Sequence, residues 1–239
     1  MKALILAGGR GSRLTDITKL QNKSLIKIGG KCLIEHNLDK VATIAEISEI
    51  VIVVGYRAED IINRFGTEYK GKKIRYVIQK EQHGLVHAIE CAKEAIGSDD
   101  FLLMLADELL INEKVKDMVQ KFCSENLFGI CGVINESDKQ KISKTYTVMV
   151  NENGRIFRLI EKPPVAINNL QGTGHCILKN QILDYMARTP INPNRGEKEL
   201  VDLIQCAVDE GHTILVFVVA DKYSNINTEE DIEYIEKFL

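Results

Sequence analysis

The sequence predicts an α/β protein built on an open, mainly parallel sheet with helices on both faces. Three apolar runs, each about as long as a buried strand, cover residues 2–7, 49–54 and 101–106. Between them lie segments in which apolar residues recur at helical spacing. Such alternation is typical of sheets whose parallel strands are connected by helices that pack against both faces.

The composition is that of an ordinary globular protein. The 239 residues suffice for one large domain, and 45% of them are hydrophobic and 27% charged. The net charge of -3 gives no reason to expect nucleic acid or an anionic membrane surface as a partner. No apolar run approaches the roughly 18 residues of a membrane span, and the first residues show no signal-peptide pattern. We therefore expect a cytoplasmic protein with neither kind of partner.

The rest of the first half continues the alternation of strands and helices. Continuous β-branched and apolar residues predict further strands, and apolar residues three and four apart predict helices. The expected strands cover residues 74–78 and 128–134, and the expected helices cover residues 33–45, 58–65, 85–96 and 115–123.

From about residue 140 the rhythm changes, which predicts an elaboration within a single domain of residues 1–239. Residues 146–150 and 155–160 flank the turn Asn-Glu-Asn-Gly, a pattern that predicts a β-hairpin. The remaining pattern predicts strands at 175–178 and 214–219 and helices at 181–187, 197–210 and 228–238, the last of which is capped by Thr228.

The loop after the first strand is the strongest functional feature of the sequence. Residues 8–14 read GGRGSRL, and the glycines let backbone N–H groups approach a ligand closely. Converging N–H groups form an anion site, to which Arg10, Arg13 and Lys23 add positive charge. The loop therefore predicts a nucleoside phosphate as ligand.

Two well-known glycine-rich loops do not match this stretch. The dinucleotide fingerprint G-x-G-x-x-G, started at Gly9, would need a third glycine where Leu14 stands. The P-loop pattern G-x-x-x-x-G-K-[ST] does not occur in the chain. A dinucleotide-binding oxidoreductase is therefore disfavoured.

The stretch does resemble the signature of the sugar-phosphate nucleotidyltransferases, which is usually written G-G-x-G-T-R-L with a Pro-Lys pair about a dozen residues later. Here Lys23 follows Asn22, and Asp16, Asn22 and Cys32 replace prolines of the family pattern. Further segments resemble the family in the family's order along nearly the whole chain. The resemblance implies a Rossmann-like sheet in which residues 1–140 form the nucleotide-binding half and residues 141–239 the sugar-phosphate-binding half.

On the nucleotide side, the resemblance implies that Arg13 contacts the triphosphate and Lys23 the α-phosphate. Gln79, together with the run GLVHA that begins at Gly84, resembles the segment that reads the base. The residues so expected to bind nucleotide are Leu6, Ala7, Gly8, Gly9, Gly11, Ser12, Gln79, Gly84 and Asp107.

The resemblance also implies a magnesium site. Asp107 follows a buried strand, where open α/β sheets bind ligands, and carboxylates there often hold Mg²⁺. Glu108 is expected to point away from Asp107, since successive side chains near a strand end alternate. Asn225 and Asn227 stand where the family usually has aspartates and are the other candidate ligands, although a structural role stays open for each. Metal binding should therefore be weaker than the family norm.

At the sugar-phosphate end, the tripeptide Glu161-Lys162-Pro163 matches the family, whose lysine contacts the sugar phosphate. Gly174 and Glu199 lie in segments that resemble the sugar-facing ones. The resemblance thus implies Arg13, Lys23 and Lys162 as catalytic residues, and Glu161, Lys162, Gly174 and Glu199 as substrate-binding residues.

The expected activity is a Mg²⁺-dependent transfer of a nucleotide from a pyrimidine triphosphate (dTTP, UTP or CTP) to a sugar 1-phosphate. Two alternatives stay open: a cytidylyltransferase for a phosphorylated alcohol such as phosphocholine, and a non-catalytic nucleotide-sugar sensor. The sequence identifies neither the sugar nor the pyrimidine, and it leaves a homo-oligomer open.

Overall fold

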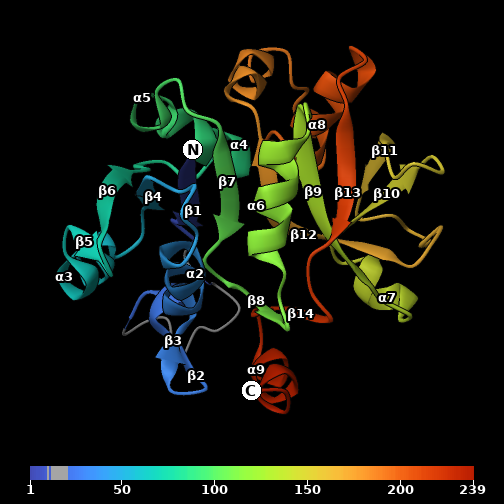
Figure 1. Ribbon diagram of the computed structural model, residues 1–239. Helices are drawn as coiled ribbons and strands as arrows, with labels where there is room; N and C mark the ends of the chain where they lie inside the picture. The colour runs from blue at the N-terminus through green and yellow to red at the C-terminus, as the bar shows by residue number, and fades with distance from the viewer. Residues whose placement is uncertain (10, 12–20) are drawn as a thin grey trace.

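The computed structural model describes residues 1–9, 11 and 21–239, and an eight-stranded sheet lies at the centre of this part of the chain (Figure 1). The strand order is β13-β9-β12-β7-β1-β4-β6-β5. These strands are β1 (Lys2–Ala7), β4 (Glu49–Val54), β5 (Glu68–Tyr69), β6 (Lys72–Ile78), β7 (Phe101–Leu105), β9 (Gly129–Asn135), β12 (Leu170–Leu178) and β13 (Ile214–Val218).

Three short antiparallel pairs and the helices complete the described fold. The pairs are β2 (Lys27–Ile28) with β3 (Lys31–Cys32), β8 (Glu108–Ile111) with β14 (Lys222–Asn225), and β10 (Tyr146–Val150) with β11 (Ile156–Glu161). The α-helices are α2 (Leu33–Ala42), α3 (Ala58–Phe65), α4 (Gly84–Cys91), α5 (Lys93–Ile96), α6 (Val115–Ser124), α7 (Lys139–Ile142), α8 (Leu200–Asp209) and α9 (Glu229–Glu236). Two 3-10 helices are η1 (Lys23–Leu25) and η2 (Asn180–Tyr185).

The sheet is mainly parallel, as the alternation predicts. β1 pairs in parallel with β4 and β7, β4 pairs in parallel with β6, and β9 with β13. β12 lies between β7 and β9 and runs antiparallel to both. The carboxyl ends of β1, β4, β6 and β7 consequently reach the same edge of the sheet, where open α/β sheets bind ligands.

Helices cover both faces of the sheet, which confirms that part of the prediction. Leu4 and Leu6 of β1 face one core, which is shared with α4 and α8, whereas Ala3 and Ile5 face a second core, shared with α2, α3 and α6. Figure 1 shows α6 in front of the sheet and α8 behind it. Each face is thus buried, which explains why the central strands are continuous apolar runs. None of the described helices is long and apolar enough to cross a membrane.

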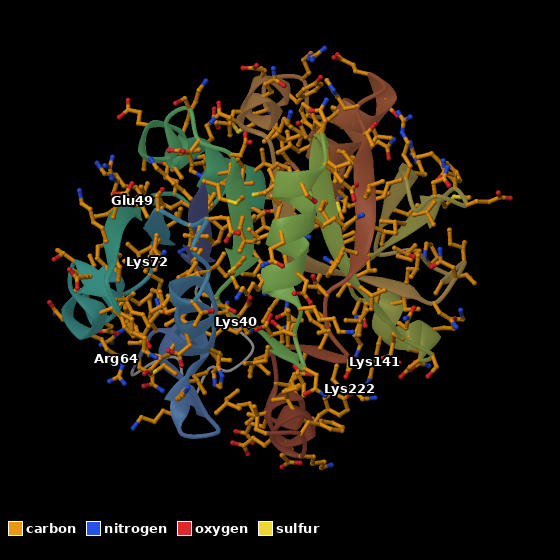
Figure 2. The ribbon with its side chains drawn as sticks, in the orientation of Figure 1. Lys40, Glu49, Arg64, Lys72, Lys141 and Lys222 are labelled. Carbon is orange, nitrogen blue, oxygen red and sulfur yellow. The ribbon has the colours of Figure 1, made fainter. Side chains whose placement is uncertain are left out.

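A third, smaller core lies below the ligand-binding edge of the sheet, where α9 packs against β14. It is formed by Ile26, Ile28, Leu33, Leu109, Ile226 and Ile235. Thr228 caps α9, and the side chains of Thr228 and Asp231 form a reciprocal capping box. Lys141 of α7 places its ammonium 4.2 Å from the ring centroid of Tyr234 in α9, and Figure 2 shows this lysine above the carboxyl-terminal helix.

The structure differs from the sequence prediction mainly in the second half. The strand expected at 175–178 begins earlier, at Leu170. The sequence pattern did not indicate this longer strand, because Gly172 and Gly174 interrupt the apolar residues. A Cβ at Gly172 would lie 2.2 Å from the Tyr146 ring, and one at Gly174 would lie 2.3 Å from the Leu105 side chain. Close packing therefore requires glycine at these two positions, where a strand would usually have β-branched or aromatic residues.

Several boundaries also differ from the expected ones. The helix expected at 197–210 begins at Leu200, with Glu199 as its N-cap. The helix expected at 181–187 is the 3-10 turn η2, and the one expected at 85–96 is divided into α4 and α5 at Ala92. The pairs β2–β3 and β8–β14 were not predicted, since strands of two to four residues carry almost no periodic pattern.

Glu108 is buried at the cavity wall and connects three strands. Its carboxylate accepts hydrogen bonds from the Tyr223 hydroxyl (2.7 Å) and the Gly174 backbone N–H (2.8 Å). Only 2% of the residue is exposed. Burial and the neighbouring Glu108 carboxylate raise the pKa of Tyr223 well above its usual range, so the hydroxyl remains a donor. Glu108 thereby fastens β8 to β12 and β14.

Removing this donor should destabilise the fold. Tyr223→Phe leaves the buried Glu108 carboxylate with one hydrogen bond fewer, and a hydrogen bond to a charged group contributes about 1.5–3 kcal/mol. We expect the free energy of unfolding, measured by chemical denaturation, to fall by about that amount.

Tyr76→Phe is the matched control. The Tyr76 hydroxyl is also buried, but among the described residues it has no hydrogen-bond partner. Its removal should therefore leave the free energy of unfolding unchanged or increase it. Equal destabilisation by the two substitutions would contradict the role given to Glu108.

Candidate active site

A cavity of about 420 Å³ opens at the carboxyl edge of the parallel strands. Its walls come from both halves of the chain, from the end of β1 to the segment that precedes α8. The predicted site residues that line it are Leu6, Ala7, Gly8, Gly9, Lys23, Gln79, Gly84, Asp107, Glu161, Lys162, Gly174, Glu199 and Asn225. Asn227 and Gly11 are described but are not part of its wall, and Arg13 and Ser12 lie outside the described residues.

The strand ends approach one another closely at the glycines. A Cβ at Gly55, after β4, would lie 2.8 Å from the Gly8 carbonyl oxygen. The same carbonyl accepts a hydrogen bond of 2.8 Å from the Gln82 side chain. Gly55 thus allows the close approach of the two strand ends, and Gly8 and Gly9, which follow β1, form part of the cavity wall.

An ion pair between the buried Lys23 and the half-buried Asp107 lines the cavity. The Lys23 ammonium is 2.7 Å from Asp107 Oδ2 and 3.2 Å from Asn227 Oδ1. The Asn227 amide in turn donates a hydrogen bond of 2.8 Å to Asn225 Oδ1. Lys23 is 6% exposed, so its charge depends on this pairing for compensation. Four predicted residues are thus connected in one polar chain.

The oxygen atoms around Lys23 are chemically suited to a magnesium ion. One carboxylate and two amide oxygens are hard ligands of the kind that Mg²⁺ prefers. Their summed charge is only that of Asp107, and the described residues contain no group of three or more acidic, histidine or cysteine side chains that could hold a metal. A divalent cation here would therefore need further oxygens from a ligand.

Gln79 follows β6 and lies in the cavity wall, with 5% of the residue exposed. Its amide nitrogen lies 3.3 Å from the Gly84 carbonyl oxygen and 3.1 Å from His87 Nδ1. Gly84 is the first residue of α4 and has a φ of +87°, a conformation that favours glycine. The structure thus brings the two predicted base-reading residues into direct contact.

The opposite end of the cavity is highly charged. Glu161 is the last residue of β11 and Lys162 follows it, and the Lys162 ammonium lies 3.4 Å from Glu161 Oε1. Burial raises the pKa of Glu161, and burial likewise raises that of Glu199. Lys162 itself has a φ of +41°, a strained conformation for a residue with a side chain, and such strain is often found at functional sites.

Arg195 is a candidate site residue that the sequence analysis did not identify. It lines the cavity, and its guanidinium lies 3.0 Å from Glu199 Oε1 and 3.9 Å from Glu161 Oε1, and also pairs with Glu197. The one sequence feature that could have indicated it is its spacing, two and four residues before glutamates at the start of a predicted helix. A lone arginine in a loop is otherwise indistinguishable from a solvated one.

Comparison with known proteins gives a consistent result. The family described as nucleotidyl transferase matches residues 2–233. The UTP–glucose-1-phosphate uridylyltransferase AglF of Haloferax volcanii is 32% identical over 240 residues, which cover 100% of this chain and 96% of that protein. Glucose-1-phosphate thymidylyltransferase of Streptomyces griseus is 27% identical over 241 residues, but this chain spans only 66% of its length.

Solved structures share the fold over nearly the whole chain. UDP-glucose pyrophosphorylase complexed with UDP-glucose superposes with a TM-score of 0.88 at 25% identity, covering 99% of this chain and 97% of that one. An apo-UDP-glucose pyrophosphorylase superposes with a TM-score of 0.87 at 24% identity and the same coverage. These matches confirm the resemblance that residues 8–23 indicate: the chain belongs to the nucleotidyl transferase family.

Proposed function

We propose that the protein joins a pyrimidine nucleoside triphosphate to a sugar 1-phosphate, giving a nucleotide sugar and pyrophosphate. The observation that carries this proposal is the single cavity in which the glycines after β1, the Lys23–Asp107 pair and the Glu161–Lys162 group meet. The names of the relatives, a uridylyltransferase and a thymidylyltransferase for glucose 1-phosphate, support UTP or dTTP as the nucleotide.

In this reaction an oxygen of the sugar phosphate forms a bond to the α-phosphorus of the triphosphate. The bond from the α-phosphorus to its bridging oxygen breaks, and the electron pair leaves with pyrophosphate. The attacking oxygen is already an anion, so the enzyme needs no general base. It must align the two phosphates and neutralise the charge that develops between them.

The charged groups at the two ends of the cavity suit these tasks. Lys23 would contact the α-phosphate, and Arg13 would contact the triphosphate and the departing pyrophosphate. Lys162, with Arg195 beside it, would hold the attacking phosphate, while the Glu161 and Glu199 carboxylates accept hydrogen bonds from sugar hydroxyls. In this proposal residues 1–140 bind the nucleotide and residues 141–239 bind the sugar phosphate.

Asp107, together with the amide oxygens of Asn225 and Asn227, would hold Mg²⁺. When bound, this ion would neutralise phosphate charge next to Lys23. Because the set includes a single carboxylate, the ion would depend on the phosphates of the triphosphate for its remaining ligands.

A substrate panel tests the proposed reaction. The protein with Mg²⁺ is given UTP, dTTP, CTP, ATP or GTP together with glucose 1-phosphate, other sugar 1-phosphates or phosphocholine, and pyrophosphate release is measured. We expect release only with a sugar 1-phosphate, and fastest with UTP or dTTP. Release with phosphocholine and CTP would identify the alternative cytidylyltransferase, and binding of a nucleotide sugar without any release would identify a sensor.

Lys23→Met should separate catalysis from metal binding. Loss of the ammonium removes charge neutralisation at the α-phosphate, so kcat should fall by about 10²–10³. The same change frees the Asp107 carboxylate, which lies 2.7 Å from that ammonium, so the protein without nucleotide should bind Mg²⁺ or Mn²⁺ about tenfold more tightly. Calorimetry with the metal alone measures the second effect.

Lys31→Met is the control for this experiment, since it removes the same charge from an exposed lysine that pairs with Asp39. It should change neither kcat nor metal affinity. Wild-type turnover in Lys23→Met, or an unaltered metal affinity, would each contradict the role given to Lys23.

Arg195→Lys should weaken use of the sugar phosphate specifically. Lysine keeps the positive charge but loses the planar fork that can bind two oxygens at once. We expect kcat/KM for the sugar 1-phosphate to fall about tenfold or more, with little change in the KM for the triphosphate. Steady-state kinetics with each substrate varied in turn measures both values, and an equal effect on the two substrates would place Arg195 elsewhere in the mechanism.

A further inference from the structure

We propose that His87 is a positioning residue that fixes the side-chain amide of Gln79, so that Gln79 Oε1 accepts the N3–H of a uracil or thymine base. This inference rests on the proposed function, and it names a base-selecting device within that site. Gln79 would touch the base, whereas His87 would act through Gln79.

The backbone carbonyl oxygen of Gly84 determines which end of the Gln79 amide donates and which accepts. The Gly84 carbonyl oxygen, 3.3 Å from the amide, can only accept, so the group that faces it must be the NH₂ of Gln79. The same NH₂ lies 3.1 Å from His87 Nδ1, which must therefore present its lone pair. In the neutral ring the proton then resides on Nε2, which lies 3.7 Å from the Cys91 sulfur.

These groups are held in place by the fold. Gly84, His87 and Cys91 lie three or four residues apart on α4 and so share one face of that helix. Burial raises the pKa of the Cys91 thiol, which keeps it neutral beside the ring. The contacts from Gln79 through His87 to Cys91 form a chain of hydrogen bonds with a single consistent direction.

Fixing the NH₂ in this way leaves Oε1 as the free end of the amide. A Cβ placed on Gly8 would lie 2.8 Å from Oε1, so this oxygen faces the backbone that follows β1, in the wall of the cavity. Within the described residues, no hydrogen bond to Oε1 is present. The cavity thus offers an acceptor next to the predicted phosphate-binding loop.

An acceptor at this position distinguishes the pyrimidines. Uracil and thymine carry a hydrogen on N3, which Oε1 can accept, whereas N3 of cytosine is itself an acceptor. To satisfy cytosine N3, the Gln79 amide would have to turn over and place its oxygen against the Gly84 carbonyl and the His87 lone pair. His87 adds to the cost of that rotation, because to donate from Nδ1 its ring would have to move the proton from Nε2 and lose the hydrogen bond that Nε2 donates to Cys91.

The test compares UTP and CTP in His87→Leu, which removes the acceptor, and His87→Asn, whose side-chain oxygen can replace Nδ1. An unsatisfied acceptor pair should make wild type prefer UTP over CTP by roughly ten- to hundredfold in kcat/KM and in calorimetric affinity. His87→Leu should reduce this preference about three- to tenfold, through KM rather than kcat, because one neutral hydrogen bond is lost. His87→Asn should restore most of it.

His83→Ala is the matched control, since His83 is exposed and lies next to His87, with ring centroids 5.2 Å apart. It should leave the UTP preference unchanged, and thermal melting should show all three variants to be folded. An unchanged UTP preference in His87→Leu overturns the inference, as does a wild-type protein that binds CTP as tightly as UTP. Preferential binding of UTP without pyrophosphate release would overturn the proposed function alone, because the binding measurement does not depend on turnover.

Discussion

The ion pair between Lys23 and Asp107 is the interaction on which the arrangement of the site depends. Lys23 is the first residue of η1, and Asp107 lies between β7 and β8, so the pair joins two segments that are 84 residues apart in the chain. The Lys23 ammonium is largely removed from water, whereas the Asp107 carboxylate is only half-buried, and an unpaired buried ammonium would cost several kcal/mol. The β8–β14 pair brings Asn225 opposite Glu108, the residue after Asp107, and Asn227 accepts a hydrogen bond from Lys23.

The side chains around Lys23 carry enough negative charge to balance one monovalent cation, and the Lys23 ammonium is that cation. Asp107 contributes the one negative charge, while Asn225 and Asn227 contribute oxygens without charge, and the Lys23 ammonium already lies among them. A divalent ion would have to displace or share that ammonium. The phosphates of a triphosphate can resolve this conflict, since they attract the lysine and at the same time complete the ligands of the metal. Substrate and metal are then expected to bind together rather than in succession.

The sequence was sufficient to predict the alternating strands and helices of the sheet and the functional residues that directly follow its strands. Continuous apolar runs identified β1, β4 and β7, and the rule that open α/β sheets bind ligands at the carboxyl ends of their strands identified Asp107. The family resemblance identified Lys23 and Gln79, and all three residues line one cavity. What the sequence could not predict depends on contacts between residues far apart in the chain. The glycines of β12 are explained by their contacts with Tyr146 and Leu105. The place of Arg195 is explained by its ion pairs with Glu161 and Glu199. Such partners leave no periodic pattern.

Gly84, at one end of the cavity, lies against Glu197, which pairs with Arg195 at the other end. A Cβ at Gly84, in the base-reading segment, would lie 2.5 Å from the Glu197 carboxylate, and Glu197 pairs with Arg195 at the sugar-phosphate end. A side chain at residue 84 would therefore displace the acidic group that holds the arginine. In the proposed function the absence of a side chain there would matter as much for the sugar phosphate as for the base, because both substrates would share this wall of the cavity. Each half of the chain would then contribute to the binding site formed by the other.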